Sequence, residues 1–312
     1  MLLIVIVVAI LYALIAYFGG LRVINNIVDR GEEGVPQFYG TIIGLGEYAL
    51  QKPMDVTLDK DGNVLVTDTN HRRVVVFDSN GEGKLIFGSK DEEEGGLSFP
   101  YGIAVDSKGN IYVADMYENR IAIFDQAGKF TKYFEPEDDY QFDGPGQIRI
   151  YDDKLYVPEV QSGNVSVFDL KGKQLVFMEN KQDEDSTLNL PNAVTIDDAG
   201  QIYISDTGRG RIAIFSDKGK YIKAVTGSEQ EDTPTLTSPR GIIVEKSRRI
   251  LVTDMLAHEV IGYNSEENKK VVEFGAMGIN AGEFQYPSGM YQTSDGMIYI
   301  VDSINHRIQK FK

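Results

Sequence analysis

Short stretches in which apolar residues alternate with small or polar ones recur along the chain, and six of them end in an acidic residue. This alternation is typical of β-strands. The six acids follow one another at intervals of 44 to 48 residues, with an aromatic residue nine positions after each and a proline before each. The acids are Asp68, Asp115, Glu159, Asp206, Asp254 and Asp302, and the prolines are Pro53, Pro100, Pro145, Pro191, Pro239 and Pro287. Three landmarks kept in register six times predict six copies of one structural unit.

The second copy shows the unit most clearly. Residues 102–106 (GIAVD), 111–115 (IYVAD), 120–125 (RIAIFD) and 129–134 (KFTKYF) read as four strands separated by turns. Gly-Asn and similar dipeptides mark the hairpin turns between them. Four short strands in about 47 residues correspond to one blade of a β-propeller. The predicted fold class is therefore all-β, a six-bladed β-propeller with four-stranded blades.

The pattern P-x-G-I-A-V-D…G-N-I-Y-V-A-D…N-R-I…F resembles the NHL repeat. Residues 70–72 and 305–307 both read Asn-His-Arg and carry the Asn-His pair of that family. The resemblance covers residues 38–312. It implies a six-bladed propeller and is unspecific for function.

The sixth unit is incomplete, because only Lys312 follows its third-strand aromatic residue, Phe311. The segment Tyr39–Ile43 (YGTII) has the character of a strand and precedes the first unit. We expect this segment to pair with the last blade as its fourth strand, since closure removes an unpaired sheet edge. In a blade with alternating strand directions, the second-to-third turns and the blade-to-blade loops share one face of the ring, which we call the loop face.

The first residues form an apolar segment without charge from Leu2 to Phe18. With residues 19–21 its length as a helix approaches the roughly 30 Å of a bilayer core. We interpret residues 1–21 as a transmembrane anchor helix, 22–37 as a linker and 38–312 as the propeller. A cleaved signal peptide is the alternative. The expected location is a single-pass membrane protein with an extracytoplasmic propeller whose loop face points away from the membrane, although Arg22 and Arg30 favour the opposite orientation.

The chain has a net charge of −16 and contains no cysteine. Thiolate nucleophiles, cysteine metal sites and disulfides are therefore excluded, and the acidic surface argues against nucleic-acid partners. Four blade-to-blade loops are acidic, so they are either solvated or form a docking surface for a cationic partner. Their charged segments are residues 91–94, 135–143, 179–185 and 229–232.

Candidate ligand-binding residues lie where the inner strands surround the central channel. The residue after each opening proline is expected at the channel mouth, and Arg149 and Tyr291 stand out further along their strands, where Arg149 would bind an anion or pair with an acid. Three histidines occupy second-to-third turns, either as residues of the repeat or as a metal site. The candidates are Tyr101, Arg149, Asn192, Arg240, Tyr291, His71, His258 and His306.

Four of the repeated acids have an arginine five positions later, which we interpret as structural ion pairs across a turn. These arginines are Arg73, Arg120, Arg211 and Arg307. In the third and fifth units Asn164 and Glu259 stand there instead, so altered turns are expected in both.

The expected function is a non-catalytic scaffold that binds a protein, peptide or carbohydrate partner on the loop face, with no catalytic residue, metal or cofactor. The alternative is a propeller hydrolase or lyase with its site at the channel mouth. Resemblance to peptidyl-hydroxyglycine lyases implies zinc-binding histidines directly after the opening prolines, and resemblance to regucalcin-like lactonases implies a metal held by Glu, Asn and Asp. Only Asn192 matches either arrangement.

Overall fold

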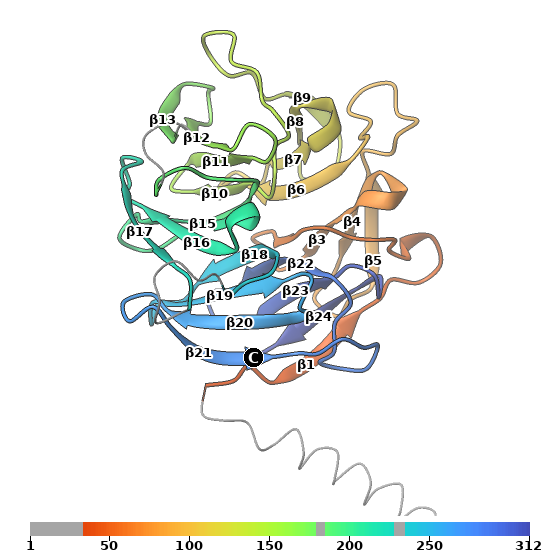
Figure 1. Cartoon of the computed structure of the whole chain (residues 1–312). Helices are drawn as coiled ribbons and strands as arrows, with labels where there is room; N and C mark the ends of the chain where they lie inside the picture. The colour runs from red at the N-terminus through yellow and green to blue at the C-terminus, as the bar shows by residue number, and fades with distance from the viewer. Residues whose placement is uncertain (1–33, 179–184, 228–234) are drawn as a thin grey trace, which may run out of the picture. The chain divides into compact units, whose positions relative to one another are not determined.

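The computed structural model describes residues 34–178, 185–227 and 235–312. The compact unit Phe38–Lys312 consists, within these residues, of six sheets of four antiparallel strands each, arranged around a common axis (Figure 1). The prediction of a six-bladed propeller is confirmed. The predicted anchor and most of the linker lie outside the described residues. Among the residues that are described, no helix is long and apolar enough to cross a membrane.

Each blade begins with its inner strand at the axis; the strands continue outward in sequence order, except that the outermost strand of blade 6 is β1. The strands of blades 1 to 3 are β2 (Val56–Leu58), β3 (Val64–Asp68), β4 (Arg73–Phe77) and β5 (Gly83–Phe87); β6 (Pro100–Val105), β7 (Ile111–Asp115), β8 (Arg120–Phe124) and β9 (Phe130–Tyr133); β10 (Arg149–Tyr151), β11 (Lys154–Glu159), β12 (Asn164–Asp169) and β13 (Gln174–Met178).

The strands of blades 4 to 6 follow the same plan. They are β14 (Pro191–Ile196), β15 (Ile202–Asp206), β16 (Arg211–Phe215) and β17 (Tyr221–Val225); β18 (Pro239–Val244), β19 (Arg249–Asp254), β20 (Glu259–Asn264) and β21 (Lys269–Phe274); β22 (Pro287–Gln292), β23 (Ile298–Asp302) and β24 (Arg307–Phe311), with β1 (Phe38–Ile42). Short 3₁₀ turns are η1 (Gly46–Tyr48), η2 (Thr69–His71), η3 (Met116–Glu118) and η4 (Thr207–Arg209).

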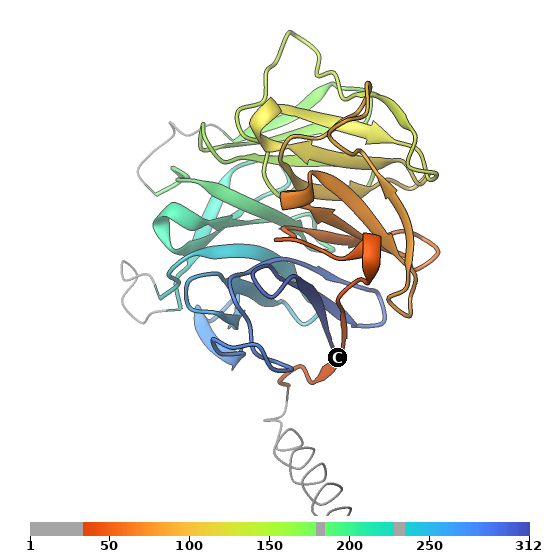
Figure 2. The same cartoon turned by 90° about the vertical axis from the view of Figure 1, so that its right-hand side faces the viewer.

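Blade 6 is completed by β1, which pairs antiparallel with β24. Phe38 lies opposite Phe311 and Ile42 opposite Ile308, and the rings of Phe38 and Phe311 meet edge to face at 5.9 Å. Figure 2 shows the C-terminus directly beside this N-terminal segment. The predicted closure is confirmed, with the strand one residue earlier than expected. The pairing covers the edge of β24, which would otherwise be unpaired.

The core lies between the blades, where side chains of adjacent sheets pack face to face. One cluster joins blades 2 and 3, and in it Phe134 and Phe142 pack on Phe168 of blade 3. The aromatic residue nine positions after each acid is fully or almost fully buried in every blade. This explains the aromatic landmark of the repeat, since a large ring fills the wedge between two diverging sheets.

The repeated acids hold the loop that leads into their own blade. In all six blades the carboxylate accepts a hydrogen bond from the backbone N–H two residues before the opening proline, at 2.6 to 2.9 Å. These acids are completely or almost completely buried. The bonds place the blade-to-blade loops and the second-to-third turns on the same face, as predicted for the loop face.

The four predicted acid–arginine pairs are present. The distances are 2.8 Å for Asp68–Arg73, 3.9 Å for Asp115–Arg120 and 2.7 Å for both Asp206–Arg211 and Asp302–Arg307. Each of these arginines also donates to carbonyl oxygens of the preceding loop. The acid and the arginine therefore both hold the loop that leads into their blade.

Blades 3 and 5 have altered turns, as expected from their missing arginines. The N–H of Gly163 and of His258 bonds to the carbonyl of the acid itself, four residues earlier. In blades 1, 4 and 6 the corresponding bond ends at the residue after the acid. In blade 3 the hydroxyl of Tyr140 donates to Glu159 and takes the place of the arginine.

Candidate ligand site at the axis

Three side chains from blades 2, 4 and 5 meet at the axis on the loop-face side. Tyr101, Asn192 and Arg240 each follow the opening proline of their inner strand, β6, β14 and β18. The Tyr101 hydroxyl donates to Asn192 Oδ1 at 3.0 Å and accepts from Arg240 Nη1 at 3.1 Å. Because blade 2 is not adjacent to blades 4 and 5, the tyrosine side chain reaches across the ring.

Several polar atoms of this cluster have no hydrogen-bond partner among the described residues. They are Asn192 Nδ2, Arg240 Nε and Gln147 Oε1. Gln147 lies two positions after the opening proline of blade 3. Asn192 and Gln147 are completely buried, and Arg240 is partly buried. Buried polar groups are nearly always paired, so an unpaired group is expected only where something else supplies the partner.

Gln147 connects blade 3 to blades 1 and 6. Its Nε2 donates to the carbonyl of Met54 in blade 1 and to the hydroxyl of Ser288 in blade 6, both at 3.2 Å. Met54 and Ser288 also follow opening prolines. Gln147 of blade 3 thus contacts residues that follow the opening prolines of blades 1 and 6.

Arg149 and Asp55 form an ion pair across the axis at a deeper level. Arg149 Nη1 and Nη2 donate to the two carboxylate oxygens of Asp55 at 2.9 and 3.2 Å. Arg149 also donates to the carbonyl of Met290, and the N–H of Ile103 donates to Asp55. Burial raises the pKa of Asp55, and the guanidinium opposes this rise. Of the two predicted roles of Arg149, the geometry favours pairing with an acid.

Tyr291 and the three histidines lie apart from the Tyr101 cluster. Tyr291 packs against the core between blades 6 and 1, and burial raises the pKa of its hydroxyl. His71 Nδ1 lies 2.8 Å from Asp68. Each of the other two histidines accepts a backbone hydrogen bond across a blade junction, His258 from Tyr286 and His306 from Lys52. Their ring nitrogens therefore serve the junctions. No group of three or more His, Cys, Asp or Glu suited to a metal ion occurs in the described part of the chain.

Aromatic rings connect the axis to the surface of the loop face. The rings of Tyr101 and Phe99 are nearly parallel, with 6.1 Å between centroids, and those of Phe99 and Tyr117 stack at 4.2 Å. Tyr101 is buried, Phe99 is partly buried and Tyr117 is 67% exposed. The sequence gives no signal for this stack, since the three rings belong to different parts of the unit and occur together in blade 2.

Charged and apolar groups share the loop face. Residues 91–94 are exposed, as are most acids of residues 135–143, whereas residues 179–184 and 228–234 lie outside the described residues. Within the described residues, eight exposed large apolar side chains also belong to its turns and loops: Ile43, Leu45, Tyr117, Leu190, Leu256, Met277, Ile279 and Tyr286.

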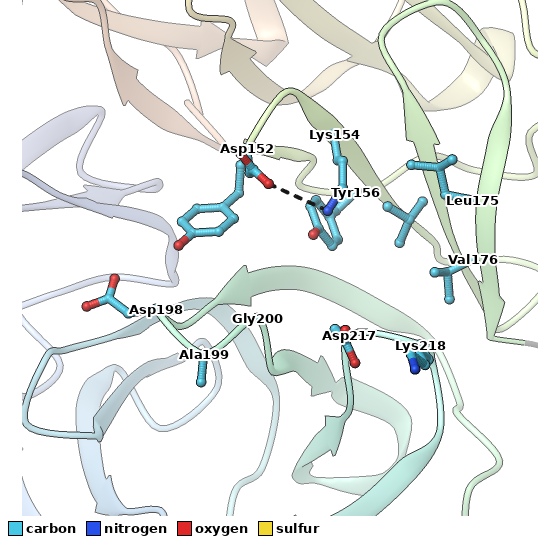
Figure 3. A pocket seen from close by; sticks show the side chains of 12 residues that line it. Asp152, Lys154, Tyr156, Leu175, Val176, Asp198, Ala199, Gly200, Asp217 and Lys218 are labelled. Carbon is cyan, nitrogen blue, oxygen red and sulfur yellow. Dashed lines mark ion pairs between the residues drawn. The ribbon is translucent and has the colours of Figure 1, made fainter.

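The opposite face carries a groove of about 730 Å³ between blades 3 and 4 (Figure 3). Its walls include Tyr151, Leu175 and Val176, and its rim includes Asp198 and Asp217. Asp152 and Lys154 form an ion pair there at 3.7 Å. The rim residues come from ordinary hairpin turns, so the sequence offers no signal for this groove.

Comparisons with known proteins agree with the repeat and the fold. The NHL repeat family matches residues 50–77, 188–215 and 284–311, and a β-propeller repeat family matches residues 93–114. The chain therefore contains NHL repeats in blades 1, 4 and 6. No curated protein matches the sequence.

Solved structures with similar folds have diverse functions. Virginiamycin B lyase from Staphylococcus aureus is 20% identical, with a TM-score of 0.60 over 84% of this chain and 80% of that one. A gluconolactonase from Xanthomonas campestris is 13% identical, with a TM-score of 0.64 over 84% and 86%. A chain of the nidogen/laminin complex is 20% identical, with a TM-score of 0.57 over 71% and 79%. At these identities the similarity establishes the fold alone.

Proposed function

We propose that this NHL-repeat propeller is a membrane-anchored, non-catalytic scaffold that binds a protein, peptide or carbohydrate partner on its loop face. The anchor is the apolar segment 1–21, and the propeller lies on the extracytoplasmic side. Nucleic acid is not a partner of this scaffold, because its net charge is −16.

The observation that carries this proposal is the uneven distribution of exposed apolar side chains. Eight of them lie in loops and turns of the loop face, whereas among the described residues the opposite face exposes Tyr151, at the end of β10, and none in its turns. Apolar side chains gathered on one face and rimmed by charges are a feature of binding surfaces. Two of these exposed side chains, Tyr117 and Tyr286, are tyrosines, a residue type enriched at interfaces.

The experiment compares partner capture by two matched double variants of the full chain in detergent. Tyr117→Ser with Leu256→Ser alters the loop face, and Leu175→Ser with Ile222→Ser alters exposed positions on the outermost strands of blades 3 and 4. A partner cross-linked to the wild-type chain in its native membrane is expected to be lost by the first variant and kept by the second. Equal capture by both variants would contradict the proposal.

The side of the membrane is tested separately. Protease added to intact cells is expected to digest the propeller if it is extracytoplasmic. Protection of the propeller until the membrane is permeabilised would place it inside.

A propeller hydrolase or lyase is the second candidate function. It is supported by the unpaired groups of Asn192 and Arg240 at the axis and by the fold shared with a lyase and a gluconolactonase. Purified chain would be analysed for bound metal and assayed for lactone hydrolysis. Stoichiometric metal together with hydrolysis that is lost in Asn192→Ala would favour the enzyme over the scaffold.

A further inference from the structure

Arg240 is a cation without an anionic partner at the centre of an acidic protein. Three other arginines that face the interior are paired with carboxylates: Arg149, Arg211 and Arg307. Arg240 has no such partner within residues 34–178, 185–227 and 235–312, and of its donors only Nη1 is bonded, to the neutral hydroxyl of Tyr101. Because a desolvated charge without a counter-charge costs free energy, an anion that reaches Arg240 gains the interaction that the fold leaves unmade.

Asn192 supplies a second unpaired donor beside it. Arg240 can only donate, so the Tyr101 hydroxyl accepts from Arg240 and gives its own proton to Asn192 Oδ1. The amide Nδ2 is left without a partner in a side chain that is completely buried. Asn192 Oδ1 and Arg240 Nη1 lie 3.0 and 3.1 Å from the hydroxyl oxygen of Tyr101, so the two side chains are neighbours.

The number and charge of these donors indicate the kind of anion. One guanidinium and one neutral amide match the single charge and the two oxygens of a carboxylate. A phosphate group carries up to two charges and three acceptor oxygens, which a single cation does not balance.

The aromatic stack indicates what is attached to the carboxylate. Tyr101, at the carboxylate position, is followed by Phe99 and then by Tyr117, which is 67% exposed. This row of rings leads from the buried Tyr101 at the axis to the exposed Tyr117 on the loop face. A ligand that follows it has an aromatic or aliphatic group next to its acid group.

We propose that Arg240 and Asn192 bind a carboxylate whose neighbouring apolar group lies along Tyr101, Phe99 and Tyr117. The carboxylate takes the place of the Tyr101 hydroxyl on Arg240 and also accepts from the unpaired Nδ2 of Asn192. This inference rests on the proposed binding function and specifies the ligand chemistry. Two sources supply that chemistry, a free small acid and the C-terminus of a peptide that ends in an apolar residue.

The test measures binding to the full chain by calorimetry, with N-acetylphenylalanine as the probe and N-acetylphenylalaninamide as its uncharged match. The acid is expected to bind at least about tenfold more tightly than the amide, because the amide lacks the charge-assisted hydrogen bonds. A short acetylated peptide ending in phenylalanine distinguishes the sources. Tighter binding of the peptide than of the single residue indicates a C-terminus, and equal binding indicates a small acid.

Three variants locate the site. Arg240→Gln is expected to weaken binding of the acid by at least about tenfold, and Arg72→Gln, at an exposed arginine of the loop face, is expected to leave it unchanged. Tyr101→Phe keeps the ring and removes the internal acceptor that competes with the ligand for Arg240, so this variant is expected to bind the acid at least as tightly as the wild type. A purely structural role of Tyr101 predicts weaker binding instead.

The inference is overturned if the acid and the amide bind equally, if neither binds at millimolar concentration, or if Arg240→Gln binds the acid like the wild type. If Arg240→Gln does not fold, the acid–amide comparison and Tyr101→Phe still decide. Loss of partner capture in the loop-face variant without any carboxylate binding leaves the scaffold standing and removes this inference alone. Carboxylate binding without partner capture leaves the carboxylate site standing and removes the proposed scaffold.

Discussion

The backbone N–H of Lys52 donates a hydrogen bond to His306 Nδ1 at 3.0 Å, although 254 positions separate the two residues. His306 lies four positions after the repeated acid of blade 6, and Lys52 immediately precedes the opening proline of blade 1. The equivalent hydrogen bond joins blades 5 and 6, from the N–H of Tyr286 to His258 Nδ1. Between blades 2 and 3 it runs from the N–H of Gly144 to Asn119 Oδ1. The histidine of the Asn-His pair in blade 6 therefore joins the last blade to the first.

Asn119, His258 and His306 occupy equivalent positions and make equivalent hydrogen bonds, which predicts the effect of changing His306. We expect His306→Ala to lower the free energy of unfolding by about 1 kcal/mol, because a junction hydrogen bond is lost. His306→Asn is expected to lose less, since Asn119 makes the same bond in blade 2. Urea denaturation measures both. If the asparagine variant is as unstable as the alanine variant, the junction bond is not what His306 contributes.

Removal of residues 38–43 is expected to destabilise the whole propeller. The deletion exposes the edge of β24, removes the buried side chain of Ile42 and takes away the ring contact of Phe38 with Phe311. Burial of Ile42 alone contributes about 2 kcal/mol. Thermal unfolding of the truncated chain is compared with that of Tyr39→Ser, a change at an exposed position of the same strand. Equal melting of the truncated and full-length chains would show that closure contributes nothing.

The Asp55–Arg149 pair predicts a strong asymmetry between single and double variants. Arg149→Met leaves a fully buried carboxylate without its partner and is expected to cost about 3–5 kcal/mol of stability. Adding Asp55→Asn removes the stranded charge, so the double variant is expected to be more stable than Arg149→Met alone. Urea denaturation of the three proteins gives the comparison. A double variant less stable than Arg149→Met would contradict this account.

Glu259 predicts a dependence of stability on pH. Burial, together with the neighbouring carboxyl of Glu273, raises the pKa of Glu259 to about 7, while Lys270 holds the pKa of Glu273 low. The folded protein therefore keeps a proton that the unfolded chain releases above the ordinary glutamate pKa of 4.5. Stability contributed in this way is complete below pH 4.5 and is lost as pH rises to about 7.

The corresponding variant is Glu259→Gln, which cannot ionise. It is expected to be more stable than the wild type at pH 8 by about 1 kcal/mol, a value reduced for solvent screening. Between pH 5 and 7 its stability is expected to change less with pH than that of the wild type. Glu266→Gln, at an exposed position in the same blade, serves as the control. A variant with an unchanged pH profile would show that Glu259 does not carry the raised pKa.

Repetition explains which features were predictable from the sequence. The six blades, the closure by β1 and the four acid–arginine pairs all follow from landmarks that recur in register. The role of the acids in holding the loops was missed, although a signal was present. Glu159 and Asp254 keep the acid where the arginine is absent, so the acid must have a partner other than arginine.

Contacts made only once in the ring could not be predicted in the same way. Tyr101, Asn192 and Arg240 come from three blades, and each differs from its equivalents in the other blades, so no repeated pattern indicates that they meet. The sequence placed them at the axis but could not show which of them touch. The same holds for Asp55, which pairs with Arg149 across the ring although both residues differ from their equivalents in the other units.

The pairing of β1 with β24 has a consequence for synthesis on the ribosome. The earliest strand of the propeller joins a sheet whose other three members are the last strands to be translated. Until they emerge, the nascent polypeptide holds β1 without its partner, and five blades stand in an open arc. Formation of the complete ring therefore has to wait for β24, and it depends on pairing between strands far apart in the sequence.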